Sequence, residues 1–446
     1  MHKVIHATKH IFLDKVKTKE MKIGVIGLGY VGLPLAMEFA QEGYSVVGID
    51  IDEQKVATLN QGQSHIIDIS NAVVNDSIDS GNFTATTDFS AIKTLDAVSI
   101  CVPTPLNKNQ EPDISYIETT IDQLLDNYGQ PLLMVLESTT YPGTTRELLA
   151  DRFAAAGYQV DQDYFVCFSP ERVDPGNEMY QTKQIPKVIG GISEASTEIA
   201  QKLYEDVLDE IVPVSSPETA EMSKLLENTF RSINIAFVNE MALMCDRMGV
   251  NIWESIDAAS TKPFGYMPFY PGPGVGGHCI PLDPMYLHWK GKQDKFFSQF
   301  IELSQMINMN MPYKVVEKVQ EALDSIGKSI KSSKILLLGM AYKSNIDDVR
   351  ESPALDVYEI LNEKDCQLDV LDPFVTSFKD KVGNQIAVRM NTMIDYSEYD
   401  CVVVLTKHDI FDYDKILEES QTIVDMRYSW KAHAGELQDK IFTIGG

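Results

Sequence analysis

The chain has 446 residues, too many for one hydrophobic core, so we expect two or three domains. Its formal net charge of −27 argues against nucleic acid as a partner, because a phosphate backbone needs a basic face. A small anionic ligand held by a few local cations stays compatible with that charge. No run of about 18 or more apolar residues occurs, so we expect no membrane-spanning helix.

The six cysteines, at positions 101, 167, 245, 279, 366 and 401, are scattered without a Cys-x-x-Cys pair. This spacing predicts reduced thiols of a cytoplasmic protein rather than a disulfide framework, and it predicts no metal site. Cys101, Cys167 and Cys401 each lie in an apolar, strand-like run, so we expect them to be buried for packing.

Residues 1–20 contain several lysines and histidines but lack the continuous apolar core and cleavage site of a signal peptide. We therefore predict a loosely ordered leader, or an alternative start, before the first strand begins at Met21.

A dinucleotide-binding fingerprint follows that start. An apolar run to Ile26 leads into Gly27, Gly29 and Gly32, then a helical pattern to Glu42 and a second strand that ends in Asp50. A glycine pattern that follows a strand and opens a helix predicts a tight turn with the helix N-terminus facing the phosphates. Asp50 stands about twenty residues past the glycines, where such a unit places its ribose-binding acid.

Further strands are predicted at 97–102, 132–136, 164–168 and 187–190, separated in part by helical stretches. Such alternation indicates a mostly parallel sheet, whose strands end together at the ligand crevice. The polar segments after three of these strands are 102–105, 137–139 and 169–171.

From Pro217 to about Arg247 the pattern is one long helix, and helices continue with breaks to about Ile326. Lys224 and Asn228 are four residues apart and share a face. Helix periodicity alone favours a solvated polar face for the two. A charged linker, 328–334, then precedes strands at 334–341, 367–372, 402–405 and 422–425, which predict a second sheet without the glycine fingerprint.

The segment 271–284 places Cys279 among glycines, with Asp283 four residues later. Glycines let the backbone approach a ligand closely, so a cysteine there is better explained as a nucleophile than as a packing residue. His278 is adjacent, but adjacency in sequence gives no hydrogen-bond geometry, and we interpret it as a loop residue.

Together these motifs resemble the nucleotide-sugar 6-dehydrogenases, the family of UDP-glucose and UDP-N-acetylhexosamine dehydrogenases. The resemblance rests on the segments 27–33, 102–105, 137–139, 169–171, 224–228, 276–283 and 341–352. It implies an α/β fold with two Rossmann-like, doubly wound parallel-sheet domains joined by a central α-helical domain. The expected boundaries are a leader at 1–20, an NAD-binding domain at 21–210, a helical dimerisation domain with the catalytic loop at 211–327, and a UDP-sugar-binding domain at 328–446.

The resemblance also implies roles for single residues. It implies oxidation of a sugar C6 alcohol to a carboxylate by two NAD⁺, through a thiohemiacetal and a thioester on Cys279. The implied catalytic residues are Cys279, Lys224, Asn228, Asp283, Glu171 and Thr139. Those implied for NAD are Gly27, Gly29, Tyr30, Val31, Gly32, Asp50, Lys55, Pro103, Thr104 and Thr139. Those implied for the UDP-sugar are Glu171, Arg172, Lys224, Asn228, Arg231, Phe269, Tyr270, Gly276, Lys343 and Arg427. Lys343 and Arg427 are also compatible with solvated loop cations.

Two departures indicate the sugar. The UDP-glucose branch carries an arginine before the glycine-rich loop, which 261–270 lacks, and a glutamate where this chain has Pro175. Both favour a UDP-N-acetylhexosamine. We expect Arg231 to contact the sugar or the carboxylate that forms on it. Cys-Ile-Pro-Leu-Asp resembles the UDP-GlcNAc and UDP-GalNAc oxidisers more than the UDP-ManNAc ones. Nothing in the sequence decides between the first two, and UDP-GlcNAc is taken as the first expectation.

Alternatives stay open. They are a UDP-GalNAc, UDP-ManNAc or UDP-glucose dehydrogenase, a catalytically inactive nucleotide-sugar-binding protein, and a two-electron 3-hydroxyacid dehydrogenase. The last class has no cysteine nucleophile and no third domain. The resemblance further implies a homodimer or higher homo-oligomer.

Overall fold

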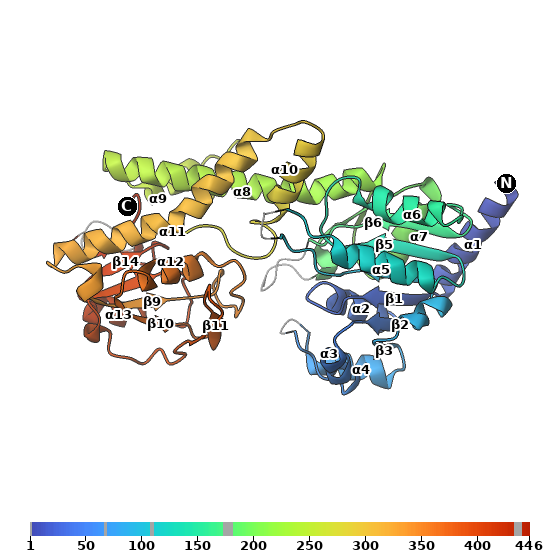
Figure 1. Cartoon of the computed structure of the whole chain (residues 1–446), viewed down its shortest axis with the longest axis horizontal. Helices are drawn as coiled ribbons and strands as arrows, with labels where there is room; N and C mark the ends of the chain where they lie inside the picture. The colour runs from blue at the N-terminus through green and yellow to red at the C-terminus, as the bar shows by residue number, and fades with distance from the viewer. Residues whose placement is uncertain (1, 67–68, 108–110, 173–181, 432–438) are drawn as a thin grey trace. The chain divides into compact units, whose positions relative to one another are not determined.

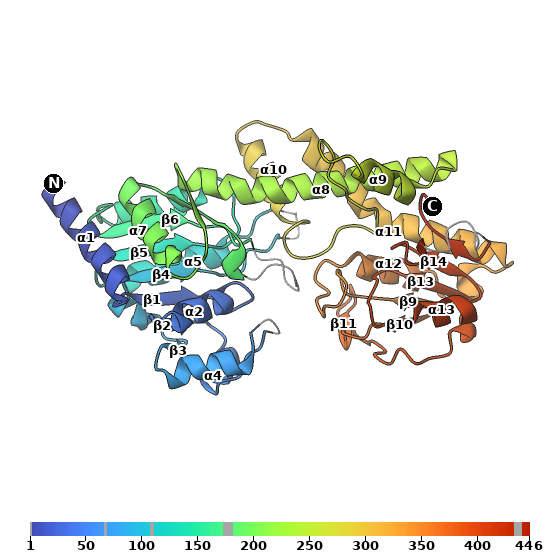
Figure 2. The same ribbon diagram turned by 180° about the vertical axis from the view of Figure 1, so that it is seen from behind.

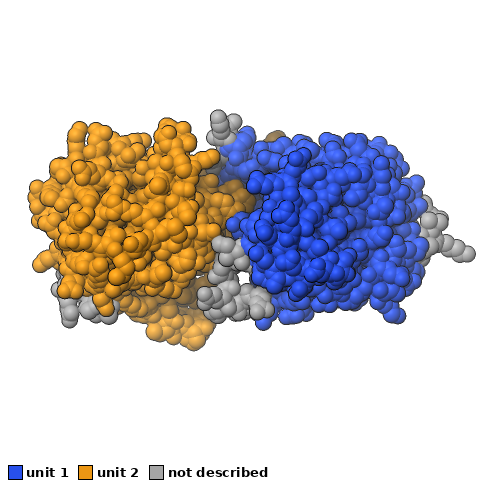
Figure 3. All heavy atoms as spheres, turned by 90° about the horizontal axis from the view of Figure 1, so that it is seen from below, with its two compact units in different colours: residues 1–227, 285–294 blue, residues 228–284, 295–446 orange. Residues whose placement is uncertain are grey.

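The computed structural model describes residues 2–66, 69–107, 111–172, 182–431 and 439–446. The chain forms two compact units (Figure 3). Unit 1 comprises residues 1–227 and 285–294, and unit 2 comprises residues 228–284 and 295–446. The predicted helical segment 211–327 is shared between them, so the three-domain division with its boundaries remains a proposal.

Unit 1 is built on an eight-stranded sheet of order β3-β2-β1-β4-β5-β6-β7-β8 (Figures 1 and 2). The first six strands are parallel, whereas β7 runs antiparallel to β6 and parallel to β8. The strands are β1 Lys22–Ile26, β2 Ser45–Ile49, β3 Phe83–Thr86, β4 Ala97–Ile100, β5 Leu132–Leu136, β6 Tyr164–Phe168, β7 Lys187–Gly191 and β8 Ile211–Val214.

Helices cover both faces of this sheet. Alternate residues of each central strand therefore lie in different cores. On β5, Leu133 and Val135 join a core with α1, α2 and α7, while Met134 joins one with α5, η2 and α6. The helices of unit 1 include α1 His2–Thr18, α2 Gly32–Gln41, α3 Glu53–Asn60, α4 Asn71–Asp79, α5 Ser115–Asp126, the π-helical turn η2 Thr145–Ala150, α6 Asp151–Ala155, α7 Glu194–Glu205 and the part of α8 Pro217–Met248 up to residue 227. The strands predicted at 97–102, 132–136, 164–168 and 187–190 are confirmed as β4, β5, β6 and β7.

The predicted loosely ordered leader is wrong. Residues 2–18 form α1, and Phe12 and Val16 of this helix are buried against the sheet. The Phe12 ring lies 5.1 Å from that of Phe165 on β6. The polar composition of the segment hid its few apolar residues, whose spacing of four places them on one helical face.

Unit 2 contains a five-stranded parallel sheet of order β10-β9-β13-β14-β15 and the two-stranded sheet β11-β12. The strands are β9 Lys334–Leu338, β10 Gln367–Leu371, β11 Ser377–Lys379, β12 Gln385–Ala387, β13 Cys401–Val404, β14 Ile423–Asp425 and β15 Ile441–Phe442. Residues Ile335 and Leu337 of β9 face a core with α9, α11, α12 and the later part of α8, while Leu336 and Leu338 face one with α13.

The helices of unit 2 follow the predicted breaks. They are the part of α8 Pro217–Met248 from residue 228 on, α9 Ile252–Ser260, α11 Gln299–Ser325, α12 Pro353–Asn362 and α13 Tyr413–Glu419. The helix α10 Asp283–Gln293 lies in unit 1 from residue 285 on. Among the described helices, none has the length and apolar character needed to cross a membrane.

Candidate active site

The glycine fingerprint forms the turn from β1 to α2, and its packing explains why glycine is required. Gly27 has φ +89°, and a Cβ there would lie 2.6 Å from the carbonyl oxygen of Cys101. A Cβ on Gly32 would lie 1.9 Å from the carbonyl oxygen of Gly27. Around Gly29, by contrast, none of the described residues approaches within 4 Å of such a Cβ, which leaves room for a phosphate group.

Asp50 follows β2 and is buried beside this turn. Its carboxylate accepts hydrogen bonds from the backbone N–H of Leu28 at 2.8 Å and of Asp52 at 3.0 Å, and from Lys55 Nζ at 2.7 Å. Burial raises the pKa of Asp50, but the hydrogen bonds from Lys55 and the two backbone groups outweigh it and lower the pKa below its usual value. The acid is therefore ionised and fixed in direction, and Lys55 is held by it.

The segments that the sequence placed at the carboxyl ends of strands do lie at one edge of the sheet, because β4, β5 and β6 are parallel. Pro103 and Thr104 follow β4, and the carbonyl oxygen of Thr104 accepts a hydrogen bond from the Tyr286 hydroxyl at 2.9 Å. Thr139 follows β5, and its hydroxyl oxygen accepts from Lys224 Nζ at 2.6 Å. Lys224 is buried, so this contact orients its ammonium group.

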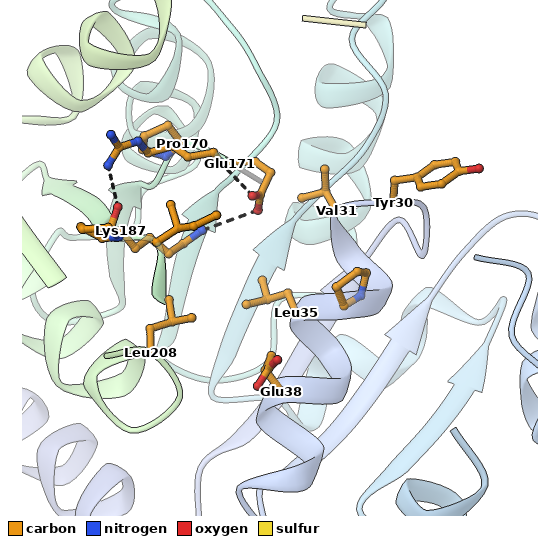
Figure 4. Close-up of a pocket in the computed structure, with 12 residues that line it drawn as sticks. Tyr30, Val31, Leu35, Glu38, Pro170, Glu171, Lys187 and Leu208 are labelled. Carbon is orange, nitrogen blue, oxygen red and sulfur yellow. Dashed lines mark hydrogen bonds and ion pairs between the residues drawn. The ribbon is translucent and has the colours of Figure 1, made fainter. Parts of the chain in front are cut away.

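Glu171 follows β6 and lines a pocket together with Tyr30 and Val31 of the glycine turn (Figure 4). Lys187 Nζ lies 3.9 Å from the Glu171 carboxylate and 2.6 Å from that of Glu137, which is fully buried. Burial opposes the charge of Lys187, but the carboxylates of Glu137 and Glu171 raise its pKa. Lys187 is therefore a buried cation next to the Glu171 carboxylate.

Arg172 has partners within unit 1. Its guanidinium pairs with the Glu227 carboxylate, at 2.9 Å from Nη2 and 3.2 Å from Nε, and donates to the carbonyl oxygen of Pro186 at 2.6 Å. Its guanidinium is thus engaged by neighbours of its own unit. Pro175, which bears on the choice of sugar, lies outside the described residues.

Unit 2 carries the predicted nucleophile. The backbone N–H of Asp283 donates to the carbonyl oxygen of Cys279 at 2.8 Å, which closes one helical turn at the start of α10. The Asp283 carboxylate is buried and accepts from Asn228 Nδ2 at 2.6 Å. Asn228 is four residues after Lys224 on the same helix, α8. The cysteine is half-buried, whereas Cys101, Cys167 and Cys401 are fully buried, as predicted.

The glycine-rich loop packs against the segment 341–352, so two motifs that are far apart in the sequence meet. The N–H of Gly277 donates to the carbonyl oxygen of Arg350 at 3.0 Å, and a Cβ on Gly276 would lie 2.6 Å from that of Tyr342. Lys343 belongs to the same segment. Arg427 also reaches the loop, since its Nη1 would lie 2.9 Å from a Cβ on Gly272.

The remaining predicted sugar-binding residues differ in their surroundings. Phe269 packs edge-on against Phe230 at 5.9 Å. Tyr270 stacks on Trp253, and its hydroxyl donates to the Asp257 carboxylate at 2.8 Å. The side chain of Arg231, on α8, is exposed.

Sequence profiles of one enzyme family match this chain in three successive parts. Its NAD binding domain matches residues 21–208, its central domain residues 218–310, and its UDP binding domain residues 336–432. The chain belongs to the UDP-glucose/GDP-mannose dehydrogenase family. The family assignment made from the motifs is thereby confirmed, as are the fold class and NAD as the cofactor.

Several relatives of this dehydrogenase carry names that refer to acetamido sugars. A UDP-N-acetyl-D-mannosamine dehydrogenase from Methanococcus maripaludis strain C7 is 36% identical over 395 residues, 87% of each chain. An NDP-N-acetyl-D-galactosaminuronic acid dehydrogenase from Ralstonia nicotianae is 34% identical, over 92% of this chain and 96% of its own. The solved UDP-D-ManNAc dehydrogenase of Pyrococcus horikoshii has a TM-score of 0.85 at 33% identity, covering 95% of this chain and 99% of that one.

A structure named as a UDP-glucose dehydrogenase, from Pyrobaculum islandicum, is also similar, with a TM-score of 0.81 at 26% identity over 93% of this chain and 95% of that one. The names of the first relatives therefore fit the alternatives UDP-ManNAc and UDP-GalNAc rather than UDP-GlcNAc specifically. For this dehydrogenase, what they support is a nucleotide-sugar substrate.

The described residues of the dehydrogenase fit NAD at the β1–α2 turn. The open space at Gly29 and the ionised Asp50 suit a pyrophosphate and a ribose diol, respectively. No group of three or more His, Cys, Asp or Glu within the described ranges is arranged to hold a metal ion.

Sequence reasoning assigned no role to Glu137, Lys187 and Glu221. Each is buried, and each has a hydrogen-bond partner 50 or more residues away in the chain. Only Glu137 carried a sequence signal, since it opens the motif Glu-Ser-Thr at the end of β5.

Proposed function

We propose that this dehydrogenase oxidises the C6 alcohol of a UDP-N-acetylhexosamine to the carboxylate, through a thioester on Cys279. The observation that supports it most is the environment of the cysteine. Cys279 lies in a glycine-rich loop, its carbonyl oxygen accepts from the Asp283 N–H, and the Asp283 carboxylate accepts from the Asn228 amide. Such a loop is suited to a nucleophile, because it leaves access for a carbonyl carbon.

The proposed chemistry takes four electrons from the sugar. When bound, each of two NAD⁺ molecules in turn accepts one hydride. Loss of the first hydride and the hydroxyl proton turns the alcohol into an aldehyde, and the thiolate of Cys279 adds to its carbon. The resulting thiohemiacetal loses its hydroxyl proton and the second hydride and becomes a thioester, which water cleaves to the carboxylate and the free thiol.

Lys224 and Asn228 are proposed to stabilise the oxygen that gains negative charge when the thiolate adds. The Lys224 ammonium already donates to Thr139, so its orientation is prepared before the substrate arrives. Removing a single donor of this kind typically lowers kcat by roughly 10²–10³-fold. Asp283, Glu171 and Thr139 are proposed to position the water and to carry its proton.

The UDP group is proposed to bind to unit 2, through the loop around Gly276 and the cations Lys343 and Arg427. Arg231 is proposed to contact the sugar. For the epimer, the names of the relatives favour UDP-ManNAc or UDP-GalNAc, while the Cys-Ile-Pro-Leu-Asp motif favours UDP-GlcNAc or UDP-GalNAc. The homodimer and the cytoplasmic location remain predictions.

The test is the yield of NADH per mole of limiting sugar, with UDP-ManNAc, UDP-GlcNAc, UDP-GalNAc and UDP-glucose in parallel. Two NADH from one acetamido sugar are expected for the wild type. Cys279→Ala removes the thiol that carries the second oxidation, so this yield is lost.

Cys366→Ala is the matched control, because Cys366 is also half-buried and also lies in unit 2. It is expected to keep the yield of two NADH. One NADH per sugar in the wild type, or turnover of UDP-glucose alone, would contradict the proposal.

A further inference from the structure

Glu221 is a buried carboxylate on α8 with three neutral donors. One helical turn before Lys224, it accepts from the backbone N–H of Gly143 at 2.6 Å and of Thr145 at 2.8 Å, and from the Thr145 hydroxyl at 2.6 Å. Only 1% of the residue is exposed. Neutral donors compensate a buried charge less than a cation does, so burying this carboxylate in its charged form costs folding free energy.

The same stretch of chain begins at Thr139, the residue that Lys224 holds. Glu221 and Lys224 are three residues apart and share one face of α8. The helix therefore fixes the segment 139–145 at both ends: Lys224 at Thr139, and Glu221 at 143–145.

A turn closed by internal hydrogen bonds joins these two ends. The Thr144 N–H and hydroxyl both donate to the carbonyl oxygen of Tyr141, at 3.1 and 2.8 Å. The hydroxyls of Thr140 and Thr144 lie 2.5 Å apart. A displacement at residues 143–145 is thus passed on to Thr139 rather than absorbed between them.

Glu221 also caps the helical stretch that follows. The π-helical turn η2 begins at Thr145, and Thr144 at its N-cap makes no side-chain capping hydrogen bond. The first N–H groups of a helix need acceptors, and a negative charge there is favourable. A carboxylate from α8 supplies both.

We propose that Glu221 is a positioning residue, whose carboxylate holds the segment 139–145 so that the Thr139 hydroxyl meets the Lys224 ammonium. This inference rests on the proposed function, in which Lys224 stabilises the developing oxyanion. Glu221 acts through Thr139 and Lys224.

Protonation changes how the Glu221 carboxyl matches its donors. Burial raises the pKa of Glu221 to about 7, although the hydrogen bonds from Thr145 and Gly143 act in the opposite direction. A protonated carboxyl turns one acceptor oxygen into a donor, so it matches three donors less well. The charged groups around it are Glu218 and Lys224 on α8, Arg146 of η2 paired with Glu218 at 2.6 Å, and Glu147 of η2 paired with Lys290 of α10 at 2.9 Å.

Amide hydrogen exchange of the peptide 139–150 tests the hold without any substrate. After correction for the intrinsic rate, the protection of Glu221→Gln at pH 8 is expected to be lower than that of the wild type, because the variant keeps the shape but loses the charge. Glu218→Gln is the matched control: this residue precedes Glu221 by one turn, contacts Arg146 of η2, and is more exposed.

Steady-state kinetics then tests the consequence. Glu221→Gln is expected to lower kcat roughly tenfold, with KM for NAD⁺ within about twofold of the wild type. Glu218→Gln is expected to behave as wild type. Unchanged exchange or unchanged kcat in Glu221→Gln would overturn the positioning role. If the wild type oxidises no UDP-sugar, the proposed function fails, while the exchange experiment still decides whether Glu221 holds the segment.

Discussion

Two of the buried carboxylates of unit 1, those of Glu137 and Glu221, meet opposite kinds of partner. Glu137 faces the Lys187 ammonium at 2.6 Å, whereas the hydrogen-bond donors to Glu221 among the described residues are neutral N–H and O–H groups. Removing one member of a buried ion pair leaves an uncompensated charge, so Glu137 and Lys187 tolerate single substitutions poorly. Glu221 can be replaced by its neutral isostere without stranding a cation, which makes it the better residue to probe.

Glu221 predicts a pH dependence of stability. The unfolded carboxyl has a pKa near 4.5 and the folded one about 7. Between these values the folded chain keeps a proton that the unfolded chain has lost, so the free energy of unfolding falls as the pH rises. The loss is complete above pH 7 and amounts to up to about 3 kcal/mol.

Urea denaturation of wild type and Glu221→Gln at pH 5 and pH 8 measures it. The wild type should lose stability relative to the variant between the two pH values, because the titration of other groups cancels in the difference. An equal change in both proteins would show that Glu221 does not titrate in this range.

At the scale of elements, the helix α1 makes a prediction that the leader hypothesis excluded. Phe12→Ala removes a buried ring from the contact with Phe165 and is expected to cost roughly 3 kcal/mol of unfolding free energy. Chemical denaturation measures this cost. Ile11→Ala, whose side chain is 54% exposed, is the control and should change little. Similar stability of the two variants would mean that α1 is not packed on unit 1 in solution.

The elements that were predicted correctly are those with a strong local signal. The run Leu132–Leu136 is apolar throughout because both faces of a central parallel strand are buried. The strands that escaped detection lie at edges or are short. The strand β8 contains Pro213 at the edge of its sheet, and β3 is a four-residue strand at the other edge.

For the candidate site, local sequence predicted the glycine turn and the acid Asp50, since both depend on spacing within one βαβ unit. The contact of Lys224 with Thr139 joins residues 85 positions apart. Only the resemblance assigned them to one site. The contacts of Glu221 and Lys187 depend on tertiary packing alone. Neither hydrophobic periodicity nor a sequence motif predicts them.

At the scale of the whole molecule, the net charge of −27 acts on the approach of substrates. NAD⁺ and a UDP-sugar both carry net negative charge, so the field of the protein repels them over distances beyond the Debye length. Raising the ionic strength from about 0.02 to about 0.2 M should therefore increase kcat/KM roughly twofold or more. The measurement is initial NADH formation at low substrate.

Under saturating substrate, kcat should not respond to salt, which serves as the internal control. A kcat/KM that falls with salt would mean that local cations such as Lys343 and Arg427 dominate the approach of the nucleotide.

Unit 1 is discontinuous in the chain, and this has a consequence for biosynthesis. Its last piece, residues 285–294, is separated from the rest by 228–284. That piece supplies Tyr286, which is fully buried against Tyr141 and Leu225 and donates to Thr104. During translation the nascent N-terminal unit therefore waits for a segment of unit 2 to be made before its core can close. Until then the apolar surface around Tyr141 and Leu225 is exposed to solvent, and we expect a chaperone to be able to bind it.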